Sequence, residues 1–286
     1  MMQGKRVIIT GANSGIGKET AVALAAQGAQ IVMLCRNRAR AEAARTEIIQ
    51  RSGNDQIDIV LGDFASLASV AAAAETIKQR YDRIDVLLNN AGAYFSKREN
   101  SQDGYEMTFA VNHLAPFLLT KLLLPVLEAS QPARIVNVSS LAHTLTGMNF
   151  KQLQDPTSYN GLFVYARSKL ANILFTYALA ERLKGRNITA NTLHPGTIAS
   201  GFAEGGSDLF AWFIRLGRPF MISAEEGAKT SIYLASSPDV AQTTGKYFVK
   251  SKMRHSSGAS YDRANQQLLW QLSEELIAAK LPQVPL

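Results

Sequence analysis

This sequence has a single cysteine, Cys35, among 286 residues, which excludes an internal disulfide. The cysteine ends an apolar run, a place typical of a small buried residue rather than a reactive thiol. Internal repeats, low-complexity segments and the ligand spacing of a zinc site are also missing, and we expect no metal. These absences exclude a disulfide scaffold and a repeat array and favour a reducing compartment.

Long apolar runs and arginine-rich segments are absent too. The stretch from Met107 to Thr120 is too short to span a bilayer. The first strand begins within about five residues, which leaves no room for a signal peptide or anchor. The net charge of +7 comes without basic runs interleaved with aromatics, so nucleic acid is not an expected partner. We expect a soluble, cytoplasmic protein without integral membrane contact.

The sequence does contain a regular alternation of apolar strand patterns and helical patterns. With 47% hydrophobic and 19% charged residues, it has an ordinary globular composition. No linker divides residues 1–286, so we predict a single α/β domain in which right-handed crossovers join parallel strands and ligands bind at their carboxyl ends. Expected strands are residues 7–10, 30–35, 57–63, 84–88, 134–140, 187–193 and, last, 245–249. Expected helices start at residue 17 and cover 38–51, 66–81, 105–130 (bent at Pro116), 165–184, 225–236 and 261–280.

Three glycines follow the first strand and mark a tight turn into a helix. Such a turn lets the backbone approach a pyrophosphate, whose charge the helix N-terminus stabilises. A nucleoside-triphosphate loop is excluded, because Ala12 replaces its first glycine and Glu19 replaces its hydroxyl residue. We therefore predict a cofactor site, formed by Gly11, Asn13, Ser14, Gly15, Ile16 and Gly17.

The ends of the second and third strands indicate which cofactor binds. In dinucleotide folds an acid at the second strand end bonds the ribose 2′-hydroxyl, whereas an arginine accepts a 2′-phosphate. Here the residue is Arg36, with Asn13, Asn37 or Arg38 as helpers, which points to NADP(H). The alternative is an ordinary arginine at a helix start. Asp63, at the third strand end, is placed to bond the adenine amino group.

Tyr165 and Lys169 are four residues apart and so lie on one helix face. A tyrosine pKa of about 10 falls beside a positive charge, which would suit the phenol to exchange a proton with a substrate oxygen. An exposed helix pair is the alternative, but the pair follows a strand that ends in two hydroxyls, Ser139 and Ser140. Together with the glycine turn, these signals favour an oxidoreductase.

With these motifs the sequence resembles the short-chain dehydrogenases/reductases over essentially its whole length. The resemblance implies a Rossmann-like, doubly wound parallel sheet with helices on both faces. It also implies that Tyr165 is the acid/base, that Lys169 tunes it and holds the nicotinamide ribose, and that Asn112 carries a water of the proton relay. Ser140, rather than Ser139, is the expected partner of the substrate oxygen, because it is the second serine of Asn-Val-Ser-Ser.

The same resemblance assigns further cofactor contacts. Asn89 and Gly92 match the Asn-Asn-Ala-Gly motif beside the cofactor, and Pro195, Gly196 and Thr197 match the turn that holds the carboxamide. Within the family the sequence is most similar to the retinol-dehydrogenase-like branch, which includes the WW-domain oxidoreductases. The supporting stretches are residues 34–37, 134–143, 168–175 and 245–248. Two departures are the missing N-terminal anchor and Ala115-Pro116 in place of Gly-His.

Apolar side chains near these motifs favour an apolar aldehyde or ketone, retinal-like, as substrate. A lid is expected at residues 198–222, with glycine hinges. Its apolar residues are Phe202, Phe210, Trp212, Phe213, Phe220 and Met221. A wall before Tyr165 is expected to carry Met148, Phe150 and Phe163. Packing on the protein's own core or on a second copy in a homodimer is the alternative.

Two other functions fit parts of the pattern. A redox sensor would keep the fold and NADP(H) without chemistry, but it would not need Asn112, Ser140, Tyr165 and Lys169 together. A protochlorophyllide-type reductase would lack the serine and use additional cysteines, whereas this chain has Ser140 and a lone cysteine. The leading hypothesis is hydride transfer between NADP(H) and a carbonyl or alcohol.

Overall fold

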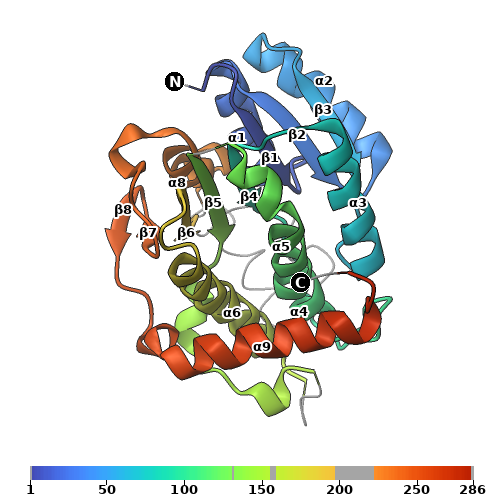
Figure 1. Ribbon diagram of the computed structural model, residues 1–286, viewed down its shortest axis with the longest axis vertical. Coiled ribbons are helices and arrows are strands. Elements are labelled where there is room, and N and C mark those ends of the chain that lie inside the picture. The colour runs from blue at the N-terminus through green and yellow to red at the C-terminus, as the bar shows by residue number, and fades with distance from the viewer. Residues whose placement is uncertain (1, 131, 155–158, 197–221, 285–286) are drawn as a thin grey trace.

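The computed structural model describes residues 2–130, 132–154, 159–196 and 222–284. An eight-stranded sheet in the order β3-β2-β1-β4-β5-β6-β7-β8 forms its centre (Figure 1). The strands are β1 (Arg6–Thr10), β2 (Gln30–Cys35), β3 (Ile57–Leu61), β4 (Val86–Asn89), β5 (Ala133–Val138), β6 (Ile188–His194), β7 (Tyr247–Val249) and β8 (Lys252–Arg254). All neighbours pair in parallel except β7 and β8, so the predicted single-domain, doubly wound α/β fold is confirmed.

Helices cover both faces of this sheet. One layer consists of α1 (Gly15–Ala26), α2 (Arg38–Ser52) and α8 (Ala224–Ser236). The other consists of α3 (Leu67–Arg80), α5 (Ala115–Glu128), α6 (Gly161–Arg182) and α9 (Arg263–Lys280). In Figure 1 the C-terminal helix α9 runs across α6, with which it makes contact.

Successive residues of the strands enter two different cores. Ile8 and Val32 pack with the layer of α3, α5, α6 and α9, whereas Ile9 and Met33 pack with α1, α2 and α8. Because neighbouring side chains of a strand point to opposite faces and both faces are covered, β1, β2 and β4 read as nearly continuous apolar runs. Polar residues at the carboxyl ends of these strands therefore stand out from the pattern.

The expectation that residues 245–249 form the last strand was wrong, because β8 follows and pairs antiparallel with β7. Every residue of β8 is exposed, so it carries no apolar signature. The hairpin turn also lacks the usual glycine or asparagine, since Lys250 and Ser251 themselves take positive φ angles of 51° and 57°. A charged sheet edge of this kind opposes pairing with a further strand.

The single helix predicted for residues 105–130 is interrupted. It consists of α4 (Met107–Phe109), a π-helical turn (Ala110–Leu114) and α5. The N–H of Ala115 donates to the carbonyl of Ala110, five residues back, just before Pro116, which has no N–H to give. The wide turn places Asn112 at the interruption.

This interrupted helix is also longer than the apolar stretch that the sequence suggested. Among the described residues, Met107–Glu128 is the one helix whose length and composition would suffice to cross a membrane. Sixty-seven per cent of its apolar window is buried within the fold. A helix that packs against the sheet in this way meets the same criteria as a membrane span, because its apolar surface faces the core.

Helix α6 begins at Gly161, four residues ahead of the predicted start at Tyr165. The Asn160 side chain caps it by accepting the N–H groups of Leu162 and Phe163. Two short 3₁₀ helices, Leu141–Leu145 and Phe150–Gln152, lie between β5 and α6. The expected lid, residues 198–222, lies outside the described residues except for Ile222.

Candidate active site

The glycine turn at the end of β1 is packed too tightly for side chains. A Cβ on Gly17 would lie 2.5 Å from the Gly11 carbonyl oxygen and 2.5 Å from Asn90 Nδ2. A Cβ on Gly11, whose φ is +67°, would lie 3.2 Å from the Ala91 backbone. Gly15 also has a positive φ, of 53°. The backbone therefore comes close to the surface of the turn, as a dinucleotide site requires.

The N-terminus of α1 lacks a side-chain cap. Its N-cap, Ser14, makes no side-chain capping bond, and α5, which continues directly from the π-helical turn, is the other long helix described without one. By contrast, α2, α3, α6, α8 and α9 are all capped by side chains. Uncapped N–H groups at a helix start are favourable partners for a phosphate group. The residues present thus fit a dinucleotide cofactor.

Asn90, which is not among the predicted site residues, fixes this turn. Its Nδ2 donates to the Thr10 carbonyl oxygen (2.8 Å), and its own N–H donates to Thr10 Oγ1 (2.9 Å). Asn89, which was singled out, points inward and donates to Asn137 Oδ1 (2.8 Å) and Thr120 Oγ1 (2.9 Å). Two adjacent asparagines at a strand end point in opposite directions, and the sequence contains no signal of which one faces the turn.

Arg36 lies at the expected adenosine end and is exposed. Asn37 is engaged as the cap of α2, where its Oδ1 accepts the N–H of Arg40 (2.9 Å). Asp63 is partly exposed, and its Oδ1 accepts the N–H of Ala65 (3.0 Å). Arg36 therefore stands at the end of β2 as a cation beside the predicted ribose position.

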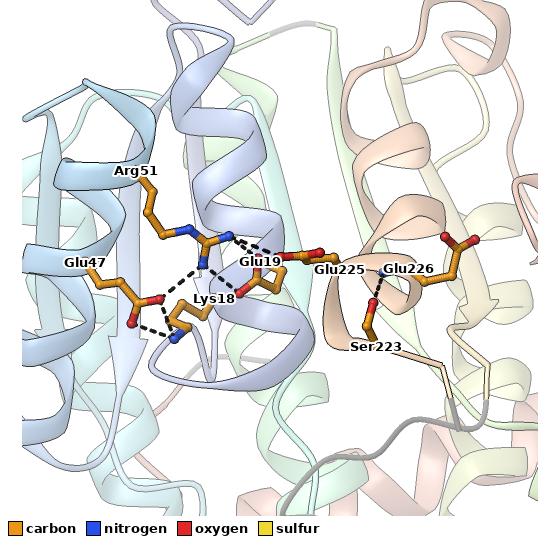
Figure 2. Close-up of polar contacts among 7 residues, drawn as sticks. All are labelled: Lys18, Glu19, Glu47, Arg51, Ser223, Glu225 and Glu226. Carbon is orange, nitrogen blue, oxygen red and sulfur yellow. Dashed lines mark hydrogen bonds and ion pairs between the residues drawn. The ribbon is translucent and has the colours of Figure 1, made fainter. Parts of the chain in front are cut away.

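Lys18 on α1 and Arg51 on α2 are bound to carboxylates. Figure 2 shows Lys18 bound to Glu47 and Arg51 bound to Glu19, at distances of 2.6 to 2.9 Å. Arg51 also reaches Glu225 at the start of α8, 3.6 Å away. This network joins the glycine-turn helix to its two neighbours, and exposed ion pairs of this kind each contribute about 0 to 1 kcal/mol.

The two serines at the end of β5 are in different environments. Ser139 is buried, and its Oγ donates to the Lys169 carbonyl oxygen (2.7 Å). Ser140 is partly exposed, accepts the N–H of Ala142 at its Oγ (3.2 Å) and hydrogen-bonds the hydroxyl of Tyr165. This geometry favours Ser140 over Ser139 as the serine that reaches a substrate.

Tyr165 and Lys169 are brought together on one face of α6, as their spacing predicts. Lys169 Nζ lies 5.6 Å from the centre of the Tyr165 ring and donates to the Val138 carbonyl oxygen (3.2 Å). Both side chains are buried, Tyr165 with 7% and Lys169 with 3% of its surface exposed. The edge of the Tyr94 ring packs against Tyr165 with the ring centres 6.1 Å apart.

The expected lowering of the Tyr165 pKa by Lys169 was wrong for this structure. Burial raises the pKa of Tyr165 above its usual value, and the Ser140 hydrogen bond opposes this only in part. Burial also lowers the pKa of Lys169 to about 8. Removal from water disfavours both charged forms, and it is the largest cause of both shifts.

Asn112 and Gly92 complete the cluster. The Asn112 side chain is fully buried, accepts the N–H of Ala93 (2.7 Å) and donates to the Ala93 carbonyl and to Ser168 Oγ. A Cβ on Gly92 would lie 3.0 Å from Lys169 Nζ and 3.3 Å from Asn112 Oδ1. The segment after β4 therefore lies directly on the lysine, and Asn112 holds it there.

The remaining predicted residues are only partly described. Pro195 and Gly196 follow β6, and Gly196 has a φ of +103°. Thr197 and the apolar residues expected in the lid lie outside the described residues. Met148 and Phe150 pack against the protein core, which fits the alternative given for them, whereas Phe163 is 46% exposed.

In comparisons with known proteins, the chain is similar to members of one family. The model of the short chain dehydrogenases matches residues 5–207. Mouse (Mus musculus) retinol dehydrogenase 14 is 43% identical over 97% of this chain and 87% of its own length. An uncharacterised Mycobacterium paratuberculosis protein of known structure is 31% identical, with a TM-score of 0.78 over 96% of this chain and 94% of its own.

A third relative is a Brucella melitensis 3-ketoacyl-(acyl-carrier-protein) reductase, solved in complex with NADH. It is 26% identical, with a TM-score of 0.68 over 87% of this chain and 97% of its own.

Proposed function

The chain belongs to the short-chain dehydrogenase/reductase family, and we propose that it reduces apolar aldehydes or ketones with NADPH. The observation that carries this proposal is the cluster of Ser140, Tyr165, Lys169 and Asn112 beside an uncapped glycine turn. Both features lie at the carboxyl edge of one sheet, where ligands of doubly wound folds bind. The retinol dehydrogenase relative supports an alcohol or carbonyl as substrate.

The side chains of the cluster suit the reductive direction. Reduction of a carbonyl needs a hydride at the carbon and a proton at the oxygen. A bound nicotinamide would supply the hydride. Burial keeps the Tyr165 phenol protonated because it raises the pKa, so Tyr165 is a proton donor. The Ser140 hydroxyl, bonded to Tyr165, is placed to donate to the same substrate oxygen. Lys169 is held against Gly92 and the Val138 carbonyl, where its charge supports the developing phenolate.

An apolar substrate is supported by side chains that flank the cluster. Leu141 and Leu145 follow Ser140 and are 55% and 52% exposed, and Phe163, two residues before Tyr165, is 46% exposed. The 3₁₀ helix that carries the leucines contacts α6, which carries Phe163. Large apolar side chains that stay exposed around a polar centre are typical of a ligand-binding surface.

The preference for NADPH rests on Arg36. It stands at the end of β2, and no residue of the Asp or Glu type occupies the positions next to it. Because a relative of this chain binds NADH, the family alone does not determine the cofactor. We also propose that the protein acts in the cytoplasm, in keeping with the burial of most of the apolar window of Met107–Glu128.

The test is NADPH oxidation measured against straight-chain aldehydes of increasing length, with retinal as the longest substrate. We expect kcat/KM to rise with chain length, and Phe163→Ser to flatten that rise while it leaves the shortest aldehyde unaffected. Met253→Ser is the matched control, because it removes an apolar side chain of similar exposure from β8. No dependence on length would contradict the apolar substrate, and cofactor binding without turnover of any carbonyl would favour the redox sensor instead.

A further inference from the structure

Two buried histidines hold the two ends of one peptide bond, the bond that joins Ser140 to Leu141. The Ser140 carbonyl oxygen lies 2.7 Å from His143 Nδ1. On the other side of the same bond, the N–H of Leu141 donates to His194 Nδ1, 3.1 Å away. His143 and His194 are 1% and 8% exposed, and they come from different elements, the 3₁₀ helix after β5 and the last residue of β6.

Backbone groups determine where each ring carries its proton. The N–H of Ser257 donates to His143 Nε2 (3.0 Å), and a backbone N–H is never an acceptor. The neutral His143 ring therefore has its proton on Nδ1 and donates it to the Ser140 carbonyl. By the same reasoning His194, which accepts at Nδ1, has its proton on Nε2. The two histidines are opposite tautomers, and each fits only one end of the peptide bond.

We propose that His143 and His194 are positioning residues that fix the Ser140–Leu141 peptide and thereby hold the Ser140 hydroxyl at Tyr165. This inference rests on the proposed function of Ser140. Upstream, the N–H of Ser139 donates to the Leu193 carbonyl (2.8 Å), so the chain is already held before Ser140. The histidines hold it after Ser140, which restricts rotation about the bond that follows the Ser140 Cα. With both sides fixed, the Ser140 side chain has a defined origin and direction.

The surroundings keep both rings neutral, as this arrangement requires. Burial, helped by the neighbouring His143, lowers the pKa of His194 to about 4. Burial also lowers the pKa of His143. The His143 ring packs edge-on against Tyr247, with the ring centres 5.2 Å apart, so it has little freedom to turn. A second proton on either ring would place two donors against each other at a backbone N–H.

The first test reads the tautomers in the unmodified protein. The chain has four histidines, so ¹⁵N NMR of histidine-labelled protein gives few signals. Replacement of each histidine in turn assigns them. We expect His143 to carry its proton on Nδ1 and His194 to carry it on Nε2 at neutral pH. The same tautomer at both positions, or a charged ring, would overturn the inference even if the protein proved to have no carbonyl-reducing activity.

The second test asks whether His194 acts through Ser140. His194→Phe keeps a ring but removes the acceptor, whereas His194→Asn keeps an acceptor at the position of Nδ1. With excess enzyme in single turnovers, we expect His194→Phe to slow reduction by about ten- to a hundredfold and His194→Asn to restore most of the rate. In a Ser140→Ala background, His194→Phe should change the remaining rate less than about twofold.

An equal loss with and without Ser140 would show that His194 is only structural, and the inference would fail. Should His194→Phe not fold, His143→Asn serves instead. Its amide can still donate to the Ser140 carbonyl but cannot reach the N–H of Ser257. A loss smaller than that of His143→Phe is expected, and it should likewise vanish in Ser140→Ala. If the unmodified protein reduces no carbonyl, the proposed function fails, and the tautomers alone decide the positioning role.

Discussion

The glycine turn and the serine–tyrosine–lysine cluster lie at the same edge of one sheet but are built in opposite ways. The turn depends on atoms that are missing, since a Cβ on Gly17 would overlap the Gly11 carbonyl. The cluster depends on polar side chains in an apolar setting. Burial there raises the pKa of Tyr165 and lowers the pKa of Lys169, so it favours the neutral form of each side chain. Space limits which residues the turn can accept, and solvation limits which charged forms the cluster can hold.

This difference predicts how each region responds to substitution. A change in the turn should reduce stability and cofactor binding together, because the same backbone does both. A change in the cluster should separate activity from stability, because buried ionisable groups serve chemistry at a cost to folding. Substitutions in the two regions therefore test whether space limits the turn and solvation limits the cluster.

The largest effect on stability is expected for Gly17→Ala. The added Cβ meets backbone that cannot move aside, so the free energy of unfolding should fall by about 3 kcal/mol. Cofactor binding should be lost as well, as measured by calorimetry. Gly147→Ala is the control, because nothing lies within 4 Å of a Cβ there. A stable Gly17→Ala protein that binds cofactor normally would show that the turn is not limited by space.

Lys169→Met is expected to stabilise the protein while it abolishes activity. The folded protein disfavours the charged lysine, whose pKa falls from 10.5 to about 8, which corresponds to about 3 kcal/mol at neutral pH. The unfolded chain binds the proton more tightly, so the native protein gains stability as pH rises from 8 to 10.5. The advantage of Lys169→Met should therefore shrink across that interval in urea titrations.

The exposed Lys184, with 70% of its side chain accessible, is the control for that substitution. Lys184→Met should alter the free energy of unfolding little at any pH. If Lys169→Met destabilised the protein at pH 7, the Val138 contact rather than desolvation would dominate at this position, and the contrast between the two regions would weaken.

Arg36→Ala tests the predicted ribose end of the cofactor site, where the side chain is exposed and neither close packing nor burial restricts it. A charge-assisted bond to a 2′-phosphate contributes about 1.5 to 3 kcal/mol, so NADPH affinity should fall about ten- to a hundredfold, with NADH affinity unchanged. Arg186→Ala removes the same charge from the remote turn before β6 and should have no effect. Equal affinity for both cofactors in the unmodified protein would identify Arg36 as an ordinary surface charge.

The smallest effect is expected for Arg51→Ala in the ionic network of Figure 2. Partly exposed pairs contribute little because water and salt screen them, so the free energy of unfolding should fall by about 1 kcal/mol. Activity should stay unchanged. A loss as large as that of Gly17→Ala would mean that the network, rather than the packing of the turn, positions α1.

The parts of the fold that follow from the sequence are those with strong local patterns. Short runs rich in apolar and β-branched residues identified the seven parallel strands, and the glycine spacing identified the turn. The hairpin strand β8 was missed because its residues are exposed and its turn has no glycine. The early start of α6 was missed because the Asn160 cap stands outside the apolar pattern.

Within the site, spacing predicted which side chains meet but not what the surroundings do to them. The pairing of Tyr165 with Lys169 follows from the helix period. The direction of the Tyr165 pKa does not, because burial depends on Tyr94 and on segments distant in sequence. The inward turn of Asn89, the outward role of Asn90 and the contacts of His143 and His194 likewise depend on tertiary contacts.

The central claim is that Tyr165 gives its proton to a carbonyl oxygen while a nicotinamide cofactor gives hydride. It is tested most directly by single turnovers of NADPH deuterated at the transferable position, with a long-chain aldehyde, in the unmodified protein and in Tyr165→Phe. We expect deuterium at the alcohol carbon with the unmodified protein. We expect Tyr165→Phe to transfer it more slowly by about a thousandfold, with unchanged cofactor affinity. Transfer at a near-normal rate by Tyr165→Phe would contradict the account.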